Sequence, residues 1–481
     1  MKSITHLAGK WLFAMIIITY PLHLATAGII YVDANATGAK NGSSWTDAYT
    51  YLQNALNAAG SSDSIWVAQG TYKPDRNKSY PNGTGSRTAT FQLKNGVALY
   101  GGFPSGGGNW SSRDPNIHQT ILSGDLAGND ANVPDPCNLL TEPTRAENSY
   151  NVVTGSYTDA TAILDGFTIE AGNANSSVWP DDVGGGMLNI SSSCTVNNCT
   201  FVENSSGAEG GGMYNFEATC TVNNCTFIEN SSGTTGGAMN NSQSDSHISN
   251  CTFLRNAAFY GGGGICSYLY LSNHPVVVNC SFISNKGFGA GNNAGGLYNI
   301  ESSPEVNNCS FINNSAIYGG GVSNINSSYP IITNCTFSGN SALYYGGMNS
   351  YSSSSPTLTN CTFSGNSAQY GEGGLGSGND CNVTLTDCTF SGNSAQYFGD
   401  IGTYNTGVIY LRGSSRIQGI GGMGINLGGE IVIDSNAVVD LNDPNDPNIK
   451  GTIQCDGLLD VKGNGQLKHA TVNVSRQAGG Y

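Results

Sequence analysis

Charged residues are scarce in this sequence, and basic residues are scarcer than acidic ones. Only 11% of the 481 residues are charged, and 18 Lys and Arg stand against 33 Asp and Glu, which gives a formal net charge of −15. An excess of negative charge repels phosphate backbones and anionic lipid surfaces. The composition therefore excludes nucleic acid and anionic membranes from the expected partners.

Long hydrophobic runs are missing except near the first residue. Lys2 and Lys10 precede an apolar run over 11–20, and the small residues Ala-Thr-Ala at 25–27 resemble a cleavage site. The pattern predicts a signal peptide over 1–27 and export to the cell surface or the extracellular medium. A membrane anchor is the alternative, but the run is short for a hydrocarbon core of about 30 Å. We expect no membrane span in the mature chain, whose net charge changes from −15 to −17 once the two lysines are removed.

Glycine is abundant, yet it does not recur at every third position, so a collagen triple helix is excluded. The chain contains 67 Gly, about twice the average share of roughly 7%. Hydrophobic residues make up 38%, below the usual ~45–50%. A long, polar and glycine-rich chain with regularly placed apolar residues is typical of a stacked β architecture.

Eight segments repeat with a period near 26 residues. Their central cysteines are separated by 26, 26, 29, 29, 26, 26 and 27 residues. Cys and Phe alternate with Thr or Ser, which is the period-two pattern of a β-strand. A glycine-rich corner followed by an apolar residue lies between most successive copies. The segments are VNNCTFVEN (196–204), VNNCTFIEN (222–230), ISNCTFLRN (248–256), VVNCSFISN (277–285), VNNCSFINN (306–314), ITNCTFSGN (332–340), LTNCTFSGN (358–366) and LTDCTFSGN (385–393).

The length of the repeat selects among repeat architectures. Helical repeats of about 33–47 residues and propeller blades of about 40–50 are longer, and the Asn, Ser and Gly spacers are poor helix formers. Short strands that stack in register bury an apolar face that one repeat alone cannot bury. The repeats therefore predict an all-β fold, a right-handed parallel β-helix, in one elongated domain.

The paired motifs F-x-x-N and G-G-A-[apolar] carry a family resemblance. F-x-x-N occurs in all eight repeats, and GGAM over 236–239 matches the second motif. These motifs resemble the repeats of the polymorphic outer membrane proteins of chlamydiae, and equally those of parallel β-helix proteins predicted in environmental bacteria. The resemblance covers about 165–400. It implies an adhesive role at a cell surface, although the autotransporter barrel that ends those outer membrane proteins is not found in this sequence.

The flanking segments differ from the regular repeats. SIWVAQGTYK (64–73) and FQLKNGVALYGGF (91–103) resemble the first coils of pectate-lyase-like proteins. Apolar residues between 45 and 59 follow helical spacing and Gly60 ends the pattern, which predicts a short helix that caps the N-terminal end of the stack. We predict an N-terminal cap with the first coils over 28–160, regular β-helix repeats over 161–400, and irregular C-terminal coils over 401–481.

Repeats in register place equivalent side chains in columns along the axis. Stacked asparagine amides can hydrogen-bond along the axis and form a structural ladder. The repeat cysteines form a second column and are expected to act as small buried apolar residues, whereas Cys194 and Cys220 are the best candidates for a disulfide. The predicted ladder consists of Asn204, Asn230, Asn256, Asn285, Asn314, Asn340, Asn366 and Asn393.

Two kinds of candidate binding residue stand outside these ladders. Tyrosines four residues after the ladder asparagine would form a row on which sugar rings or a partner could stack, unless they only cover the glycine corner as an aromatic edge. Two loops rich in carboxylates suit calcium ions, with solvated turns as the alternative. The tyrosines are Tyr260, Tyr318, Tyr344, Tyr370 and Tyr397. The calcium candidates are Asp125, Asp130 and Asp135 in one loop, and Asp440, Asp443 and Asp446 in the other.

The sequence offers no convincing catalytic constellation, and we assign no catalytic residue. Hydrolysis of a glycan needs paired carboxylates at a suitable separation, whereas the acids of the repeats are scattered. Lyase chemistry needs a basic residue, and only Arg255 and Lys286 are basic between 190 and 400. Nearer the N-terminus, a basic cluster could contact an acidic glycan or lie in a solvated loop. This cluster consists of Lys73, Arg76, Lys78 and Arg87.

We predict an exported β-helix protein that acts as a non-catalytic binding or adhesion module for glycans or for a cell-surface partner. A polysaccharide lyase or glycoside hydrolase acting on acidic polysaccharide is the first alternative, and a structural spacer of an envelope protein is the second. Calcium is the one cofactor that the sequence indicates. The ligand, the redox state of the cysteine column and the oligomeric state stay open.

Overall fold

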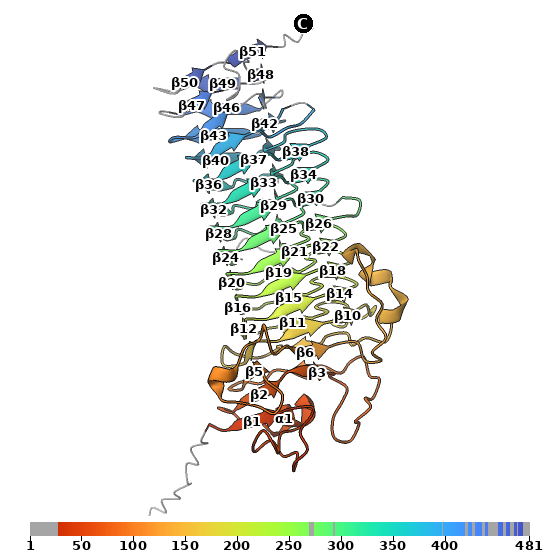
Figure 1. Ribbon diagram of the computed structural model, residues 1–481. Helices are drawn as coiled ribbons and strands as arrows, with labels where there is room; N and C mark the ends of the chain where they lie inside the picture. Colours follow the sequence, from red (N-terminus) through yellow and green to blue (C-terminus); the bar gives the residue numbers. More distant parts are fainter. Residues whose placement is uncertain are drawn as a thin grey trace, which may run out of the picture.

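The computed structural model describes residues 27–268, 274–291, 294–396, 398–418, 422–425, 429–434, 438–440, 451–455, 458–461, 466–468 and 470–474. In these residues the chain forms an elongated stack of parallel strands, with the first strands at one end and the last strands at the other (Figure 1). Strands of successive turns pair in register into four parallel sheets, here named A to D. The predicted all-β parallel β-helix is confirmed.

Sheets A and B are the two sheets that flank the repeated Asn-Cys step. Sheet A has fifteen strands: β1 Ile29–Val32, β2 Ser64–Ala68, β5 Ala98–Phe103, β8 Ile163–Asp165, β12 Thr195–Asn197, β16 Thr221–Asn223, β20 His247–Ser249, β24 Val276–Val278, β28 Glu305–Asn307, β32 Ile331–Thr333, β36 Thr357–Thr359, β40 Asn382–Thr386, β43 Val408–Arg412, β46 Glu430–Ile433 and β49 Leu458–Val461. Sheet B has fourteen: β3 Gly70–Tyr72, β6 Thr120–Ser123, β9 Thr168–Glu170, β13 Thr200–Val202, β17 Thr226–Ile228, β21 Thr252–Leu254, β25 Ser281–Ile283, β29 Ser310–Ile312, β33 Thr336–Ser338, β37 Thr362–Ser364, β41 Thr389–Ser391, β44 Arg416–Gln418, β47 Val438–Asp440 and β50 Gln466–Lys468.

Sheets C and D complete each turn on either side of the glycine-rich corner. Sheet C has eight two-residue strands: β10 Asn173–Ala174, β14 Ser205–Ser206, β18 Ser231–Ser232, β22 Ala257–Ala258, β26 Lys286–Gly287, β30 Ser315–Ala316, β34 Ser341–Ala342 and β38 Ser367–Ala368. Sheet D has fourteen strands: β4 Phe91–Gln92, β7 Val153–Thr154, β11 Met187–Ile190, β15 Met213–Phe216, β19 Met239–Ser242, β23 Ile265–Tyr268, β27 Leu297–Ile300, β31 Val322–Ile325, β35 Met348–Tyr351, β39 Leu375–Gly378, β42 Ile401–Tyr404, β45 Met423–Ile425, β48 Gly451–Cys455 and β51 Ala470–Val474.

The second asparagine of the repeated V-N-N-C motif turns the chain from sheet A to sheet B. Asn198, Asn224 and Asn250 have φ values of 50°, 54° and 54°, and the equivalent residues of the later turns have the same sign. Asparagine tolerates this left-handed conformation better than most residues, because its short side chain hydrogen-bonds locally. The repeated asparagine therefore places a corner in every turn, and the corners align because the period is regular.

Phenylalanine rings form a stacked column inside the solenoid. The rings lie in adjacent turns with centroids 4.3–5.1 Å apart and nearly parallel planes. All eight side chains are fully buried. The repeat cysteines are buried in the same core cluster, as predicted. The column consists of Phe201, Phe227, Phe253, Phe282, Phe311, Phe337, Phe363 and Phe390.

The predicted asparagine ladder lies at the corner between sheets B and C. Each side-chain amide donates from Nδ2 to Oδ1 of the asparagine in the following turn, at 2.8–3.0 Å. A second bond from the same nitrogen reaches a backbone carbonyl, which belongs to a phenylalanine in every turn after the first, for example from Asn314 to Phe282 at 2.9 Å. At the last turn Asn393 donates instead to the buried Asp400, and burial raises the pKa of that carboxyl to about 7. The ladder thus satisfies backbone groups that would otherwise be buried without partners.

A second asparagine ladder, which the sequence did not lead us to predict, lines the inner face of sheet D. Asn189 donates to Asn215, and Asn215 donates to Asn241, both at 2.8 Å. Asn299 and Asn324 repeat the contact at 2.8 Å. The interior of the solenoid therefore combines apolar columns with amide columns.

The N-terminal end carries the predicted helix, which is shorter than the sequence pattern. Helix α1 spans Leu52–Ala58 and buries Leu52, Ala55 and Leu56 against the first strands. Trp45, which starts the helical spacing, instead lies in a loop and donates from Nε1 to the carbonyl of Gly108 at 2.8 Å. Three short 3-10 helices follow: η1 Trp110–Ser112, η2 Pro136–Thr141 and η3 Pro143–Arg145. No helix within the described ranges has the length and hydropathy needed to cross a bilayer.

Candidate functional site

The outer face of sheet D carries several aromatic side chains in the regular turns. Along β35, Met348 and Ser350 are buried toward the interior, so Asn349 and Tyr351 point outward. The same alternation places Ile325 at the end of β31 and Tyr404 at the end of β42 on this face. The loop between β34 and β35 adds Tyr345 from above. A hollow forms between these side chains.

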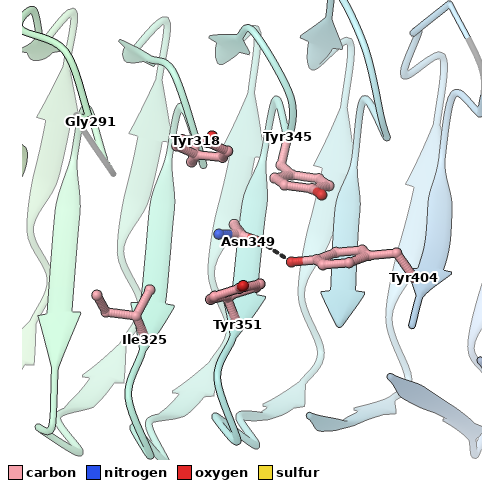
Figure 2. A pocket seen from close by; sticks show the side chains of 7 residues that line it. All are labelled: Gly291, Tyr318, Ile325, Tyr345, Asn349, Tyr351 and Tyr404. Carbon is pink, nitrogen blue, oxygen red and sulfur yellow. Dashed lines mark hydrogen bonds between the residues drawn. The ribbon is translucent and has the colours of Figure 1, made fainter. Parts of the chain in front are cut away.

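We call this hollow the tyrosine pocket, and its volume is about 360 Å³. Figure 2 shows the rings grouped over strands β31 to β42, with Asn349 between them. Because the seven lining residues are all uncharged, the pocket offers aromatic faces and amide or hydroxyl groups. The lining consists of Gly291, Tyr318, Ile325, Tyr345, Asn349, Tyr351 and Tyr404.

Two glycines of β39 make room for the rings. A Cβ at Gly378 would collide with the ring of Tyr404, and a Cβ at Gly376 would collide with the ring of Tyr345. Both glycines occupy the outward positions of a strand whose neighbour β35 carries Asn349 and Tyr351 there. The bare backbone of β39 is therefore the surface on which two tyrosines lie flat.

The rings of the tyrosine pocket are ordered relative to one another. Tyr345 and Tyr404 stack with centroids 5.4 Å apart and planes at 15°, and Tyr351 lies 6.2 Å from Tyr404 at 19°. The hydroxyl of Tyr404 donates to Oδ1 of Asn349 at 3.1 Å. Burial raises the pKa of Tyr345 and Tyr404, so both phenols stay protonated and can donate hydrogen bonds. The pocket thus combines fixed ring faces with fixed polar atoms.

A buried carboxyl lies beneath the pocket. Glu372 is 2% exposed, and its Oε2 has no hydrogen-bond partner within the described part of the chain. A Cβ at Gly402 would collide with this carboxyl, and a Cβ at Gly376 would lie 3.0 Å from it. Glycine in two adjacent turns therefore makes space for the carboxyl. Burial raises the pKa of Glu372 to about 8. The acid is therefore mostly protonated and neutral at pH 7.

A second hollow of about 430 Å³ lies next to the tyrosine pocket on the same face. The two hollows share Gly291. Glu209 is the one carboxylate of the second lining, and burial raises its pKa. The two hollows therefore follow one another along the axis of the solenoid. The second lining consists of Ala208, Glu209, Thr234, Thr235, Tyr260, Tyr268, Gly291, Tyr298 and Ile300.

The predicted tyrosine row is divided between these hollows. Tyr318 lines the tyrosine pocket and Tyr260 lines the second hollow. Tyr344 stacks on Tyr318 at 4.8 Å, and Tyr370 follows Tyr344 at 5.9 Å with tilted planes, so both extend the edge of the pocket without lining it. Tyr397 lies outside the described residues. The row is thus present over three turns, and Tyr260 stands apart from it.

Four residues of the pocket were not predicted from the sequence: Tyr345, Tyr351, Tyr404 and Asn349. Alternation within the strands following each glycine corner would have placed the last three on the outer face. Tyr345 directly follows the predicted Tyr344. This pair of tyrosines is a departure from the repeat that is visible in the sequence. Tyr351 and Tyr404 hold the same position in their turns, with Gly378 in the turn between them, whereas Asn349 and Tyr345 hold other positions, so no single column marks the group.

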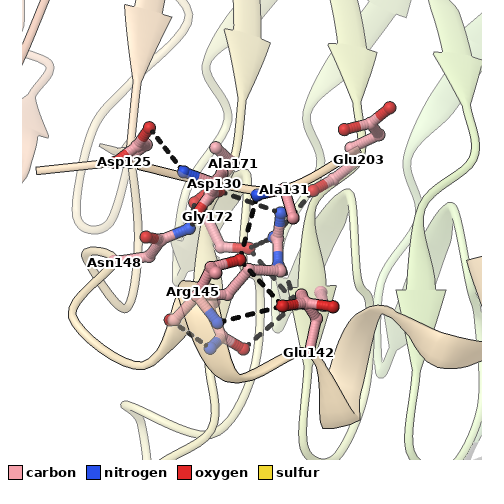
Figure 3. Close-up of polar contacts among 12 residues, drawn as sticks. Asp125, Asp130, Ala131, Glu142, Arg145, Asn148, Ala171, Gly172 and Glu203 are labelled. Carbon is pink, nitrogen blue, oxygen red and sulfur yellow. Dashed lines mark hydrogen bonds and ion pairs between the residues drawn. The ribbon is translucent and has the colours of Figure 1, made fainter. Parts of the chain in front are cut away.

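The first calcium candidate loop holds a polar network around Arg145 (Figure 3). Asp125 and Asp130 lie together with Glu147, with one oxygen of each within 4.8 Å of the others. Arg145 is 1% exposed and pairs with Asp130 at 3.3 Å, while Asn148 donates to the same carboxylate at 2.8 Å. Burial raises the pKa of Asp130 to about 6, against the opposing effects of these two partners. The structure therefore brings two of the three predicted carboxylates together and adds Glu147.

The remaining calcium candidates lie elsewhere. Asp135 caps the 3-10 helix η2, where its carboxylate accepts a bond from the backbone N–H of Cys137 at 3.0 Å, and Asp135 is not part of the carboxylate group. Asp440 ends strand β47. Asp443 and Asp446 lie outside the described residues. Calcium binding stays a prediction for both loops.

The sulfur atoms of the predicted disulfide pair approach each other closely. Cys194 and Cys220 are fully buried in adjacent turns, and their Sγ atoms are 3.0 Å apart as thiols. The column cysteines instead approach backbone groups of the preceding turn, as Cys251 Sγ does by accepting the N–H of Cys225 at 3.4 Å. The column cysteines are free cysteines buried in the core. The disulfide between Cys194 and Cys220 stays a prediction.

Comparisons with known proteins bear on the fold. A search of curated proteins found no significant match. A solved structure titled "Crystal structure of pectate lyase Pel9A" is similar over 86% of this chain and 79% of that chain, with 11% identity and a TM-score of 0.26, which supports no inference about activity. The resemblance to the chlamydial repeats stays a prediction. Residues 254–421 match the family model described as "Right handed beta helix region", and the fold of the chain is a right-handed parallel β-helix.

Proposed function

We propose that the protein is an exported, non-catalytic glycan-binding module and that the tyrosine pocket holds sugar units. The observation that carries the proposal is the grouping of Tyr318, Tyr345, Tyr351 and Tyr404 around one hollow beside an amide side chain. Aromatic rings offer broad apolar faces with a polar edge, and the C–H faces of sugar rings stack on such surfaces. A few placed polar groups then fix the orientation of the ligand.

The polar groups of the pocket suit sugar hydroxyls. Asn349 Oδ1 accepts a bond from Tyr404, and its Nδ2 lies 3.5 Å from Ser323 Oγ, at the limit of a hydrogen bond. The amide therefore has hydrogen-bonding capacity to offer a ligand. Tyr351 is 40% exposed, so one ring is open to solvent before binding. Because the lining is uncharged, the pocket fits neutral sugar units better than acidic ones.

The arrangement along the axis supports an extended ligand. The second hollow continues the face from Gly291 toward earlier turns and adds Tyr260 and Tyr298. Neighbouring turns of a parallel sheet are about 4.8 Å apart, so a glycan chain lying along the axis would cross several turns. Export is proposed from the leader sequence over 1–27, and it would place this face in contact with extracellular polysaccharide.

Affinity electrophoresis on a panel of neutral and acidic polysaccharides tests the proposal. Each polysaccharide is used with and without calcium, because Asp125, Asp130 and Glu147 group their carboxylates. Retention is recorded, and the same samples are assayed for new chain ends. We expect retention on at least one neutral polysaccharide without cleavage.

Two variants assign the retention to the pocket. The double variant Tyr345→Ala, Tyr351→Ala removes two rings, and Tyr329→Ala is the matched control because Tyr329 is 45% exposed and does not line the pocket. We expect the double variant to lose at least about tenfold in affinity and the control to keep it. Equal retention by the two variants would overturn the assignment. New chain ends would show that the polysaccharide is cleaved, and they would indicate a polysaccharide lyase or glycoside hydrolase instead of a binding module.

A further inference from the structure

Basic side chains gather at the N-terminal cap, far along the chain from the tyrosine pocket. Lys40 and Lys78 line a hollow of about 220 Å³, and Lys73 and Arg76 line an adjoining hollow of about 210 Å³. The two hollows share Thr50 and Tyr51. Four of the 18 basic residues of the chain thus surround one small region, in a protein with 33 acidic residues.

These four cations lack acidic partners. The ion pairs among the described residues involve Arg113, Arg145, Arg255 and Arg412, and none involves the cap cluster. Nε of Arg76 is buried and has no hydrogen-bond partner in the described part of the chain. The guanidinium of Arg76 also lines the second of these hollows, so it would gain from a charge-assisted hydrogen bond to an anion there.

The acidic side chains of this region accept hydrogen bonds from backbone groups of the loops, as Asp33 does from the N–H of Gly106 at 2.7 Å. Asp75 accepts the backbone N–H of Gly85 at 3.0 Å. Asp47 accepts the N–H of Ala39 at 2.7 Å and the hydroxyl of Ser44 at 3.1 Å. Within the described residues none of these carboxylates forms an ion pair with the four cations.

The uncharged groups that line the first hollow favour a charged sugar over a simple ion. Tyr49 and Tyr51 line the first hollow together with Asn54, whose Oδ1 accepts the backbone N–H of Lys78 at 2.9 Å. Aromatic faces next to cations match a sugar ring that carries a negative group, because the ring stacks while the carboxylate or sulfate pairs with Lys or Arg. The fourth basic residue of the sequence cluster, Arg87, is not part of this region, since it donates to the carbonyls of Asn148 and Asn173.

We infer that the adjoining hollows at the N-terminal cap form a second binding site, for the acidic sugar units of an anionic polysaccharide. Lys40, Arg76 and Lys78 pair with carboxylate or sulfate groups of neighbouring units, and Tyr49 and Tyr51 contact their rings. The site is independent of the tyrosine pocket, whose lining carries no charge.

Binding of polygalacturonate to the intact protein tests this inference. The variant Lys40→Gln, Lys78→Gln removes two exposed charges from the site, and Lys286→Gln, Arg416→Gln removes two exposed charges elsewhere as the matched control. At low salt we expect the site variant to lose about tenfold in affinity, with a weaker salt dependence, and the control to change less than about twofold. Thermal unfolding of both variants verifies that each is folded.

Three results would overturn the inference. The first is the absence of polygalacturonate binding by the unmodified protein. The second is an equal loss in both double variants, which would show a general charge effect. The third is competition by sodium sulfate at concentrations as low as those of the sugar units, which would show a site for a free anion. Retention on neutral polysaccharide through the tyrosine pocket is measured in parallel and does not depend on any of these results.

Discussion

The phenylalanine column inside the solenoid and the tyrosines on its outer face are built on the same turns but obey different rules. Phe201 to Phe390 stack without interruption, and each is fully buried. Within the described part of the predicted tyrosine row, the rings stack closely between Tyr318 and Tyr344 and then tilt at Tyr370. The interior must repeat because every turn packs on identical neighbours. The outer face is free to vary, and the tyrosine pocket forms where it varies.

The largest expected effect is a difference in stability between a substitution in the phenylalanine column and one in the outer tyrosines. Phe311 stacks between Phe282 and Phe337 at 4.7 and 4.9 Å and is fully buried. Phe311→Ala should lower the free energy of unfolding by about 3–5 kcal/mol through lost burial and the cavity left behind. Tyr344→Ala, on the outer edge, should cost less than about 1 kcal/mol. Urea unfolding measures both, and comparable losses would contradict the division between interior and outer face.

The next effect is a pH dependence of stability that is due to Glu372, buried beneath the tyrosine pocket. The pKa of Glu372 is about 8 in the folded chain against 4.5 as its ordinary value, so folding binds a proton between these pH values. The free energy of unfolding therefore falls as pH rises from about 4.5 through 8, by about 5 kcal/mol in total. Glu372→Gln keeps the shape of the neutral acid and should remove this fall.

Urea midpoints of the wild type and Glu372→Gln at pH 5, 7 and 9 measure the difference. Asp400 and Asp130 also titrate in this range, with pKa values of about 7 and 6, but both variants contain them, so their effects cancel in the comparison. Parallel profiles for the two proteins would show that Glu372 is not held neutral beneath the tyrosines.

Substitution in the asparagine ladder should cost less unfolding free energy than substitution in the phenylalanine column, but clearly more than substitution at a turn. Asn314→Leu removes the bonds to Phe282 and Asn340 and leaves the buried N–H of Asn285 without its acceptor. We expect a loss on the order of 3 kcal/mol in unfolding free energy. Asn308→Gly, at a left-handed corner with φ of 54°, should change stability by less than about 1 kcal/mol. A similar cost at both positions would indicate that the ladder adds nothing beyond the turn.

The smallest expected effect concerns binding. Tyr318→Ala should weaken glycan binding by only about threefold, because its ring lies at the rim and stacks chiefly on Tyr344. Stability should hardly change. Isothermal titration with the retained oligosaccharide measures the affinity. A loss as large as that of the Tyr345 and Tyr351 double variant would move the centre of the site to the predicted tyrosine row.

The fold could be predicted from the sequence because its determinants recur at fixed spacing. The left-handed asparagine corners, the phenylalanine column and the ladder from Asn204 to Asn393 each repeat a residue type, and the repetition sets the register. The helix boundary was less predictable, because Trp45 satisfies the helical spacing but packs in a loop against Tyr31 at 4.8 Å.

The candidate site was only partly predictable for the opposite reason. Gly376 aligns with Gly402 of the next turn, but the spacing of the glycines does not say that the space beside them receives the ring of Tyr345. In the acidic loop, Asp135 is close in sequence to Asp130 but caps a 3-10 helix instead of joining the group. Sequence proximity does not determine where a loop directs its side chains.

A crystal structure of the intact protein with a bound neutral oligosaccharide tests the central claim most directly. The account predicts sugar rings in the tyrosine pocket, stacked on Tyr351 or Tyr345, with a hydroxyl bonded to Asn349 and the oligosaccharide running along the axis toward Gly291. An oligosaccharide bound on another face, with the tyrosine pocket free of sugar, would contradict it.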